Sequence, residues 1–107
     1  MATAQNITIE LFGVKKRINS IKNIIQYVEQ QNKLKHISLV STQKCVIFLY
    51  NWGHLIIYSY PKDSLVTIDI LSSLNLFKTT RVKDALLKVL GTNQHKMLDT
   101  TRIIGDK

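Results

Sequence analysis

The stretch Asn51-Trp-Gly-His-Leu-Ile-Ile-Tyr-Ser-Tyr-Pro-Lys62, continued by residues 63–73, decides the fold that this sequence predicts. It contains the only Trp and the only Pro of the chain, together with two of its four Tyr. Residues 54–60 alternate like a strand, residues 61–64 have the composition of a Pro-containing turn, and residues 65–71 read as a second strand. We expect any chemistry that the protein performs to lie in this strand, turn and strand.

The side chains of the first strand alternate between two faces of the predicted sheet. One face carries an imidazole and two phenols, from His54, Tyr58 and Tyr60, together with Ile56. The other face carries small and apolar residues, namely Gly53, Leu55, Ile57 and Ser59. We expect the second set in the core under the helices. The first set is either a binding face or an aromatic ladder that faces solvent or another subunit, and the pattern leaves both open.

The second strand contains a carboxylate, Asp69, in phase with Leu65 and Thr67. A carboxylate within an apolar strand needs a partner or a shifted pKa, because burial penalises its charged form. Asp69 is therefore a candidate member of a site.

The other segments predict a strand, a helix and two strands before this stretch, and a helix and a strand after it. The predicted strands cover residues 6–12, 36–41, 45–50 and 95–104, and the predicted helices cover residues 17–33 and a segment that is capped by Thr79 or Thr80 and ended by Gly91. Two helices on one face of a mainly antiparallel sheet make an α+β fold, a two-layer sandwich. We expect a single domain over residues 1–107, with the other face of the sheet open.

The first helix has an apolar stripe on one side and polar residues on the other. The stripe is formed by Ile18, Ile21, Ile25 and Val28. The residues expected to face water are Gln26, Glu29, Gln30 and Lys33. The strand at residues 45–50 is apolar on both faces, so we expect it inside the sheet.

Basic residues outnumber acidic ones, with 15 Lys and Arg against 7 Asp and Glu, and the formal net charge is +8. Solubility explains this excess, and so does an anionic partner such as a nucleic acid or a phosphorylated small molecule. The basic residues are spread along the chain, and no aromatic–basic motif of an RNA- or DNA-binding module is present. A nucleotide-like ligand fits this pattern at least as well as a polymer.

Several classes of site and location are not expected. The one cysteine, Cys45, excludes an internal disulfide, and a cytoplasmic location follows as the default. The three His and Cys45 do not have the spacing of a zinc site, so no metal is predicted. No apolar run reaches the length of a membrane span, so no membrane partner is predicted.

The central stretch resembles the small prokaryotic S-adenosylmethionine decarboxylases. Their signature is Ser-His-Leu-x-Ile-His-x-Trp-Pro-Glu, followed by a strand that ends in Asp-x-Phe-x-Cys. Here these segments read Gly53-His54-Leu55-Ile56-Ile57-Tyr58-Ser59-Tyr60-Pro61-Lys62 and Asp69-Ile70-Leu71-Ser72-Ser73. The likeness extends from Glu10-Leu11-Phe12 in the first strand to Arg102-Ile103-Ile104-Gly105, and it implies that family's fold.

The departures from the signature concern the cofactor of that family. Its members form a pyruvoyl group by cleavage at the serine that corresponds to Gly53, and glycine has no hydroxyl for this step. The family's processing His and Ser correspond to Tyr58 and Cys45, its proton-donor Cys to Ser73, and the Glu before the cleaved serine to Trp52. Decarboxylation needs an electron sink. The resemblance therefore implies a protein that is not a pyruvoyl decarboxylase.

The remaining ligand site points to another reaction. Lys62 replaces a family Glu that resembles a ribose-hydroxyl acceptor, and a lysine can bind a phosphate but cannot accept a hydrogen bond. Small phage and phage-defence lyases act on S-adenosylmethionine or on its adenylated conjugate, SAM-AMP, which carries a phosphodiester. The methionine carboxylate attacks its own γ-carbon and expels a methylthioadenosine product, which leaves homoserine lactone without any cofactor.

We therefore expect a lyase on S-adenosylmethionine or SAM-AMP, in type III CRISPR defence signalling or in phage counter-defence. Tyr58 is the predicted catalytic residue. The predicted substrate-binding residues are His54, Tyr60, Lys62, Trp52, Asp69 and Ser73. A homo-oligomer with the open sheet face or the pocket at a subunit interface is expected, and a nucleic-acid partner is not.

Two alternatives stay open at this point. The first is a non-catalytic decarboxylase homologue, such as a prozyme-like partner or a sensor that binds S-adenosylmethionine or a nucleotide. The second is a basic nucleic-acid-binding module.

Overall fold

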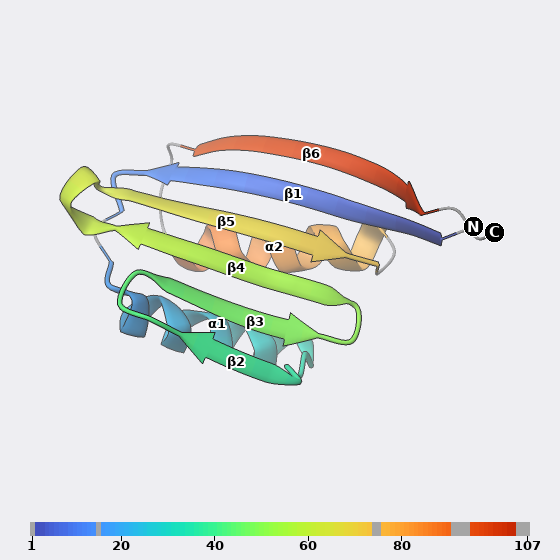
Figure 1. Cartoon of the computed structure of the whole chain (residues 1–107), viewed down its shortest axis with the longest axis horizontal. Coiled ribbons are helices and arrows are strands. Elements are labelled where there is room, and N and C mark those ends of the chain that lie inside the picture. Colours follow the sequence, from blue (N-terminus) through green and yellow to red (C-terminus); the bar gives the residue numbers. More distant parts are fainter. Residues whose placement is uncertain (1, 15, 74–75, 91–94, 105–107) are drawn as a thin grey trace.

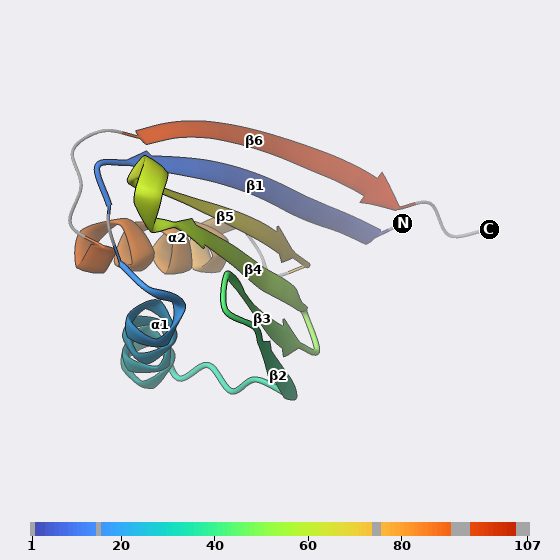
Figure 2. The same cartoon turned by 60° about the vertical axis from the view of Figure 1, so that its left-hand side comes forward.

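Six strands form one sheet, and two helices cover one of its faces (Figures 1 and 2). The structure is a computed structural model, which describes residues 2–14, 16–73, 76–90 and 95–104. The elements are β1 (Ala2–Phe12), α1 (Ile18–Asn32), β2 (Ser38–Ser41), β3 (Cys45–Tyr50), β4 (Gly53–Tyr60), the short 3₁₀ helix η1 (Pro61–Asp63), β5 (Leu65–Ser72), α2 (Leu76–Leu90) and β6 (His95–Ile104).

The strands lie in the order β2-β3-β4-β5-β1-β6, and every neighbouring pair is antiparallel. This arrangement confirms the predicted α+β two-layer sandwich with two helices on one face (Figure 2). It also places β3 inside the sheet, as the apolar character of its two faces predicts. Among the described residues, neither helix is long and apolar enough to cross a membrane.

The core lies between the sheet and the helices. Alternate residues of the inner strands point into it, among them Ile9 of β1, Phe48 of β3, Leu55 of β4 and Ile68 of β5, all with no exposed surface. The predicted stripe of α1, formed by Ile18, Ile21, Ile25 and Val28, is buried against them. A buried side chain of this size contributes about 1.5–3 kcal/mol. A slip of one residue in the pairing of a strand would turn the core side chains of that strand to the open face. Burial of these side chains therefore also sets the register of the sheet.

Three element boundaries differ by two residues or more from those predicted. β1 begins at Ala2 and not at residue 6, because its polar first half pairs with β6, from Ala2↔Ile104 onward. β2 begins at Ser38, two residues later than predicted. α2 begins at Leu76, so Thr79 lies inside the helix and does not cap it. Thr79 is 1% exposed, and its hydroxyl lies 2.9 Å from that of Ser72, which satisfies both buried groups.

The prediction that Glu29 faces water is wrong. Its side chain is buried, with 5% of the residue exposed, and its carboxylate accepts a hydrogen bond of 2.9 Å from the Tyr50 hydroxyl. The same carboxylate lies 2.9 Å from His36 Nδ1. Burial, followed by the hydrogen bond and the charge of Glu29, raises the pKa of Tyr50 far above its ordinary value. These contacts join α1 to β3, and periodicity alone did not reveal them.

Candidate functional site

The open face of β4 and β5 carries the first group of predicted residues. His54 Nε2 lies 3.2 Å from Asp69 Oδ2, and Asn6 of β1 donates its side-chain amide to Asp69 Oδ1 at 2.8 Å. Asn6 also donates to the carbonyl of Ile70 at 3.1 Å, which fixes the amide that holds the carboxylate. The carboxylate therefore has the partners that its place in the strand requires.

Tyr58 and Tyr60 form a second group on the same face of β4. Their rings are nearly parallel, at an interplanar angle of 9° and a centroid distance of 6.3 Å. Tyr58 is 42% exposed. The two phenols thus offer a partly accessible aromatic surface.

Cys45 lies opposite Tyr58 in the β3–β4 ladder. The charge of Cys45, followed by a hydrogen bond between the two side chains, raises the pKa of the Tyr58 phenol above its ordinary value. Tyr58 therefore keeps its proton at neutral pH. Its hydroxyl has one hydrogen to donate, and in this structure Cys45 is its partner.

Gly53, at the start of β4, occupies a position that no other residue fits without a shift of the backbone. Its φ is +151°, a conformation that side-chain-bearing residues rarely adopt. A Cβ atom placed there would lie 1.8 Å from the carbonyl oxygen of Leu71 in β5 and 2.7 Å from the carbonyl carbon. A serine at this position would therefore require the paired backbone of β5 to shift.

The remaining predicted residues lie at the two ends of β4. Lys62 is exposed in η1, just beyond Tyr60. At the other end, the backbone N–H and the hydroxyl of Ser73 donate to the carbonyl of Trp52, at 2.8 and 3.0 Å. Because a strand rises about 3.3 Å per residue, Trp52 and Lys62 are on the order of 25 Å apart. The predicted residues thus form separate groups within one chain, and their roles stay predictions.

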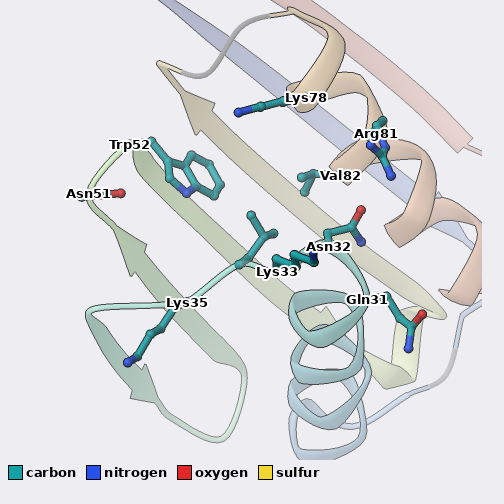
Figure 3. Close-up of a pocket in the computed structure, with 10 residues that line it drawn as sticks. Gln31, Asn32, Lys33, Lys35, Asn51, Trp52, Lys78, Arg81 and Val82 are labelled. Carbon is teal, nitrogen blue, oxygen red and sulfur yellow. The ribbon is translucent and has the colours of Figure 1, made fainter.

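A pocket of about 650 Å³ opens at the Trp52 end, on the side of the sheet that the helices cover (Figure 3). Residues from four segments line it, including Trp52 beside β4, Lys33 and Lys35 after α1, and Lys78 and Arg81 of α2. The sequence interpretation missed these basic residues as a group. They are far apart in the chain, and the only signal was the overall excess of positive charge.

The described residues show no metal centre: no group of three or more His, Cys, Asp or Glu among them is placed to hold an ion. The described site residues are therefore aromatic, imidazole, carboxylate, amide and ammonium groups. They can bind a ligand by stacking, hydrogen bonding and charge.

Comparisons with known proteins bear on the fold. No family model matches the sequence, and no curated protein matches it. Among solved structures, the chain is similar to the crystal structure of the adenosylmethionine decarboxylase from Aquifex aeolicus VF5, with a TM-score of 0.82. The alignment covers 99% of this chain and 95% of that chain, at 20% sequence identity. The protein therefore has an adenosylmethionine decarboxylase-like fold.

Proposed function

We propose that the protein is a carbon–sulfur lyase that cleaves S-adenosylmethionine or SAM-AMP to a methylthioadenosine product and homoserine lactone. The observation that carries the proposal is Gly53, which leaves no room for a serine side chain within an adenosylmethionine decarboxylase-like fold. The fold supports a ligand of the S-adenosylmethionine class. The glycine supports a reaction that does not pass through a pyruvoyl group.

The proposed reaction needs only the substrate's own groups. A carboxylate oxygen of the methionyl moiety attacks its γ-carbon, and the bond from this carbon to the sulfonium breaks. The sulfur keeps the electron pair and leaves as a neutral thioether, so no proton is transferred. The protein lowers the barrier by holding the methionyl chain in a folded shape and by excluding water.

The two phenols of the open face take the central role in this proposal. The parallel rings of Tyr58 and Tyr60 present π faces, to which a sulfonium is attracted as to other cations. In this proposal the Tyr58 hydroxyl exchanges its hydrogen bond with Cys45 for one to the substrate, and the new bond orients the substrate. Lys62, which follows these residues, binds the phosphodiester of SAM-AMP.

A second copy of the chain completes the site in this proposal. Large apolar side chains are exposed on β2, β3 and β4, namely Val40, Leu49 and Tyr58. Exposed apolar surface of this kind supports an interface between subunits. If the second copy packs on this face with its strands in the opposite direction, the end of its β4 that carries Lys62 lies over the His54–Asp69 pair of the first copy. A single chain cannot bring these residues together.

The test is incubation of the purified protein with S-adenosylmethionine and, separately, with SAM-AMP. Chromatography should show a methylthioadenosine product and homoserine lactone in equal amounts, above the spontaneous breakdown in a protein-free sample. If neither substrate is consumed faster than in that sample, the proposed activity is wrong. A positive result with SAM-AMP would place the protein in type III CRISPR defence signalling or in phage counter-defence, the setting we propose.

The alternative is a non-catalytic binding protein, either a sensor or a prozyme-like partner. One observation favours it: Asp69 is already held by both His54 and Asn6, which leaves this carboxylate committed to its neighbours. Titration calorimetry that shows saturable binding of S-adenosylmethionine or SAM-AMP without any product would support this alternative.

A further inference from the structure

The pocket at the Trp52 end lies on the helix-covered side of the sheet (Figure 3). The phenols of Tyr58 and Tyr60 lie on the open face. We infer that this pocket binds a nucleoside phosphate, whose base stacks on Trp52 and whose phosphates contact Lys33, Lys78 and Arg81. The inference goes beyond the proposed lyase reaction, which uses the opposite face.

The charge of the pocket is the first argument. Four cationic side chains line it, from Lys33, Lys35, Lys78 and Arg81, and no carboxylate is among the described residues of its lining. Figure 3 shows Lys78 extending from α2 in the direction of Trp52, whereas Lys35 points away from the centre. Lysine and arginine form charge-assisted hydrogen bonds with phosphate oxygens. The pocket therefore favours an anion with several oxygens.

The aromatic platform is the second argument. The indole of Trp52 is stacked on the ring of Tyr50, at a centroid distance of 4.4 Å and an interplanar angle of 13°. Tyr50 is held in turn by its hydrogen bond to the buried Glu29, and the carbonyl of Trp52 is held by Ser73. The indole is thus fixed before any ligand arrives. A preorganised aromatic ring is a stacking surface for a nucleobase.

The backbone at Lys33 is the third argument. This residue ends α1 in the left-handed conformation, with φ 56° and ψ 40°. Glycine is preferred at such a position, because a Cβ atom is disfavoured there. The chain nevertheless carries a lysine whose side chain lines the pocket. A residue that is unfavourable for the helix end is explained by a role in binding an anion.

The size of the pocket and its single aromatic residue favour a mononucleotide over a polymer. A volume of about 650 Å³ lies within the range of about 300–1,000 Å³ that small-molecule sites occupy. The described lining has one aromatic residue, which provides a surface for one base. Asn51, an exposed residue of the β3–β4 turn, supplies an amide for the base or the ribose.

Fluorescence gives a direct test, because Trp52 is the only tryptophan of the chain. Titration with AMP or ATP should quench its emission in a saturable way. Adenosine lacks the phosphate, and inorganic phosphate lacks the base. Each should bind more weakly than AMP by about tenfold or more, because each loses one of the two kinds of contact. Calorimetry should give the same affinities.

Charge-reversal variants identify the cations. Lys78→Glu should weaken AMP binding by about tenfold or more, because it loses one phosphate contact and adds repulsion. Lys44→Glu, in the exposed β2–β3 turn, makes the same change in net charge and should leave the affinity unaltered. Lys33→Gly should weaken binding while raising the melting temperature, a combination that a purely structural lysine would not show.

Four results would overturn the inference. One is the absence of saturable binding of both AMP and ATP. Another is an equal loss of affinity in Lys44→Glu and Lys78→Glu, which would indicate general electrostatic attraction. The third is tighter binding of a single-stranded oligonucleotide than of any mononucleotide, which would indicate a nucleic-acid site. The last is unchanged binding in both Lys33→Gly and Lys78→Glu. None of these measurements involves turnover of a sulfonium substrate, so their failure and that of the proposed lyase activity are distinguishable.

Discussion

The open face of the sheet and the pocket at the Trp52 end lie close together in sequence, on β4 and on the turn before it, but they present different chemistry. The open face carries two phenols and an imidazole–carboxylate pair, in which His54 Nε2 lies 3.2 Å from Asp69 Oδ2. The pocket carries an indole and four cations, two from the segment after α1 and two from α2. The net charge of +8 is therefore not spread evenly over possible ligand sites. A strand and the turn before it can therefore serve two different surfaces, and here they meet at Gly53.

The largest effect on stability should come from Gly53→Ser, which tests whether β4 and β5 can move apart at this position. The new Cβ would overlap the carbonyl of Leu71, and the left-handed backbone adds strain. Together these should lower the free energy of unfolding by about 3 kcal/mol, measured by urea denaturation. We also expect no self-cleavage of the variant by mass spectrometry.

The matched control is Gly13→Ser. Gly13 also has a positive φ, of +81°, but nothing lies within 4 Å of a Cβ atom placed there. This variant should lose only the conformational part, about 1 kcal/mol. Equal losses at the two glycines would show that the contact with Leu71 does not matter.

Tyr58→Phe is the next largest change, and it tests the open face alone. Loss of one hydrogen bond to the substrate in the transition state should slow turnover by about tenfold. Because Tyr58 is exposed, the unfolding free energy should change by less than about 0.5 kcal/mol. Nucleotide binding at the Trp52 pocket should be unaffected.

Tyr27→Phe is the control for this variant, because Tyr27 is a similarly exposed tyrosine on α1. It should keep full activity. Wild-type turnover by Tyr58→Phe would remove this hydroxyl from the proposed mechanism.

The pH dependence of stability should reveal the contribution of Tyr50, whose ring stacks on Trp52. The raised pKa of Tyr50 means that its phenol ionises more easily in the unfolded chain, with an ordinary value of 10.0, than in the folded one. The contribution of Tyr50 to the free energy of unfolding is therefore complete below pH 10 and is lost as the pH rises above that value. The loss should be about 1.4 kcal/mol per pH unit.

Tyr50→Phe removes this dependence, so the difference in unfolding free energy between wild type and variant should shrink as the pH rises above 10. Urea denaturation at a series of alkaline pH values measures it. A difference that stays constant over this range would contradict the assignment of the alkaline loss to Tyr50.

The smallest effect should come from Lys62→Glu, which tests the remote end of the open face. Reversal of one exposed charge should shift the preference between substrates severalfold, away from SAM-AMP and toward S-adenosylmethionine, by about 1 kcal/mol or less. Competition assays with both substrates measure this ratio. An unchanged ratio would mean that Lys62 is a solvated turn residue.

Much of the fold follows from local patterns in the sequence. The alternation of residues 54–60 assigns His54, Tyr58 and Tyr60 to the open face and Leu55 and Ile57 to the core, and the structure agrees. The stripe of α1 and the position of β3 are likewise predictable, because burial of apolar side chains dominates in these elements. The start of α2 was not predictable in this way. Thr79 resembles a helix cap in sequence, whereas in the fold its hydroxyl is paired with that of Ser72.

The candidate site shows the same division. Asp69 needed a partner, and the sequence indicated this need but not its two partners, which come from β4 and from β1. Trp52 and Lys62 lie close together in sequence, yet the whole of β4 lies between them and holds them at opposite ends of the strand. The cations of the Trp52 pocket belong to segments about forty residues apart, so their approach depends on how α1 and α2 pack on the sheet.

By itself, the sequence determined the order of strands and helices along the chain, the two faces of β4 and the absence of a side chain at residue 53, because each of these depends on residue type and short-range periodicity. Only the tertiary structure decided that Glu29 is buried beside Tyr50 and His36, that a side chain at residue 53 would meet the backbone of β5, and that Trp52 lies among cations. These features require contacts between segments that are distant in the chain, and such contacts are set by packing and strand register.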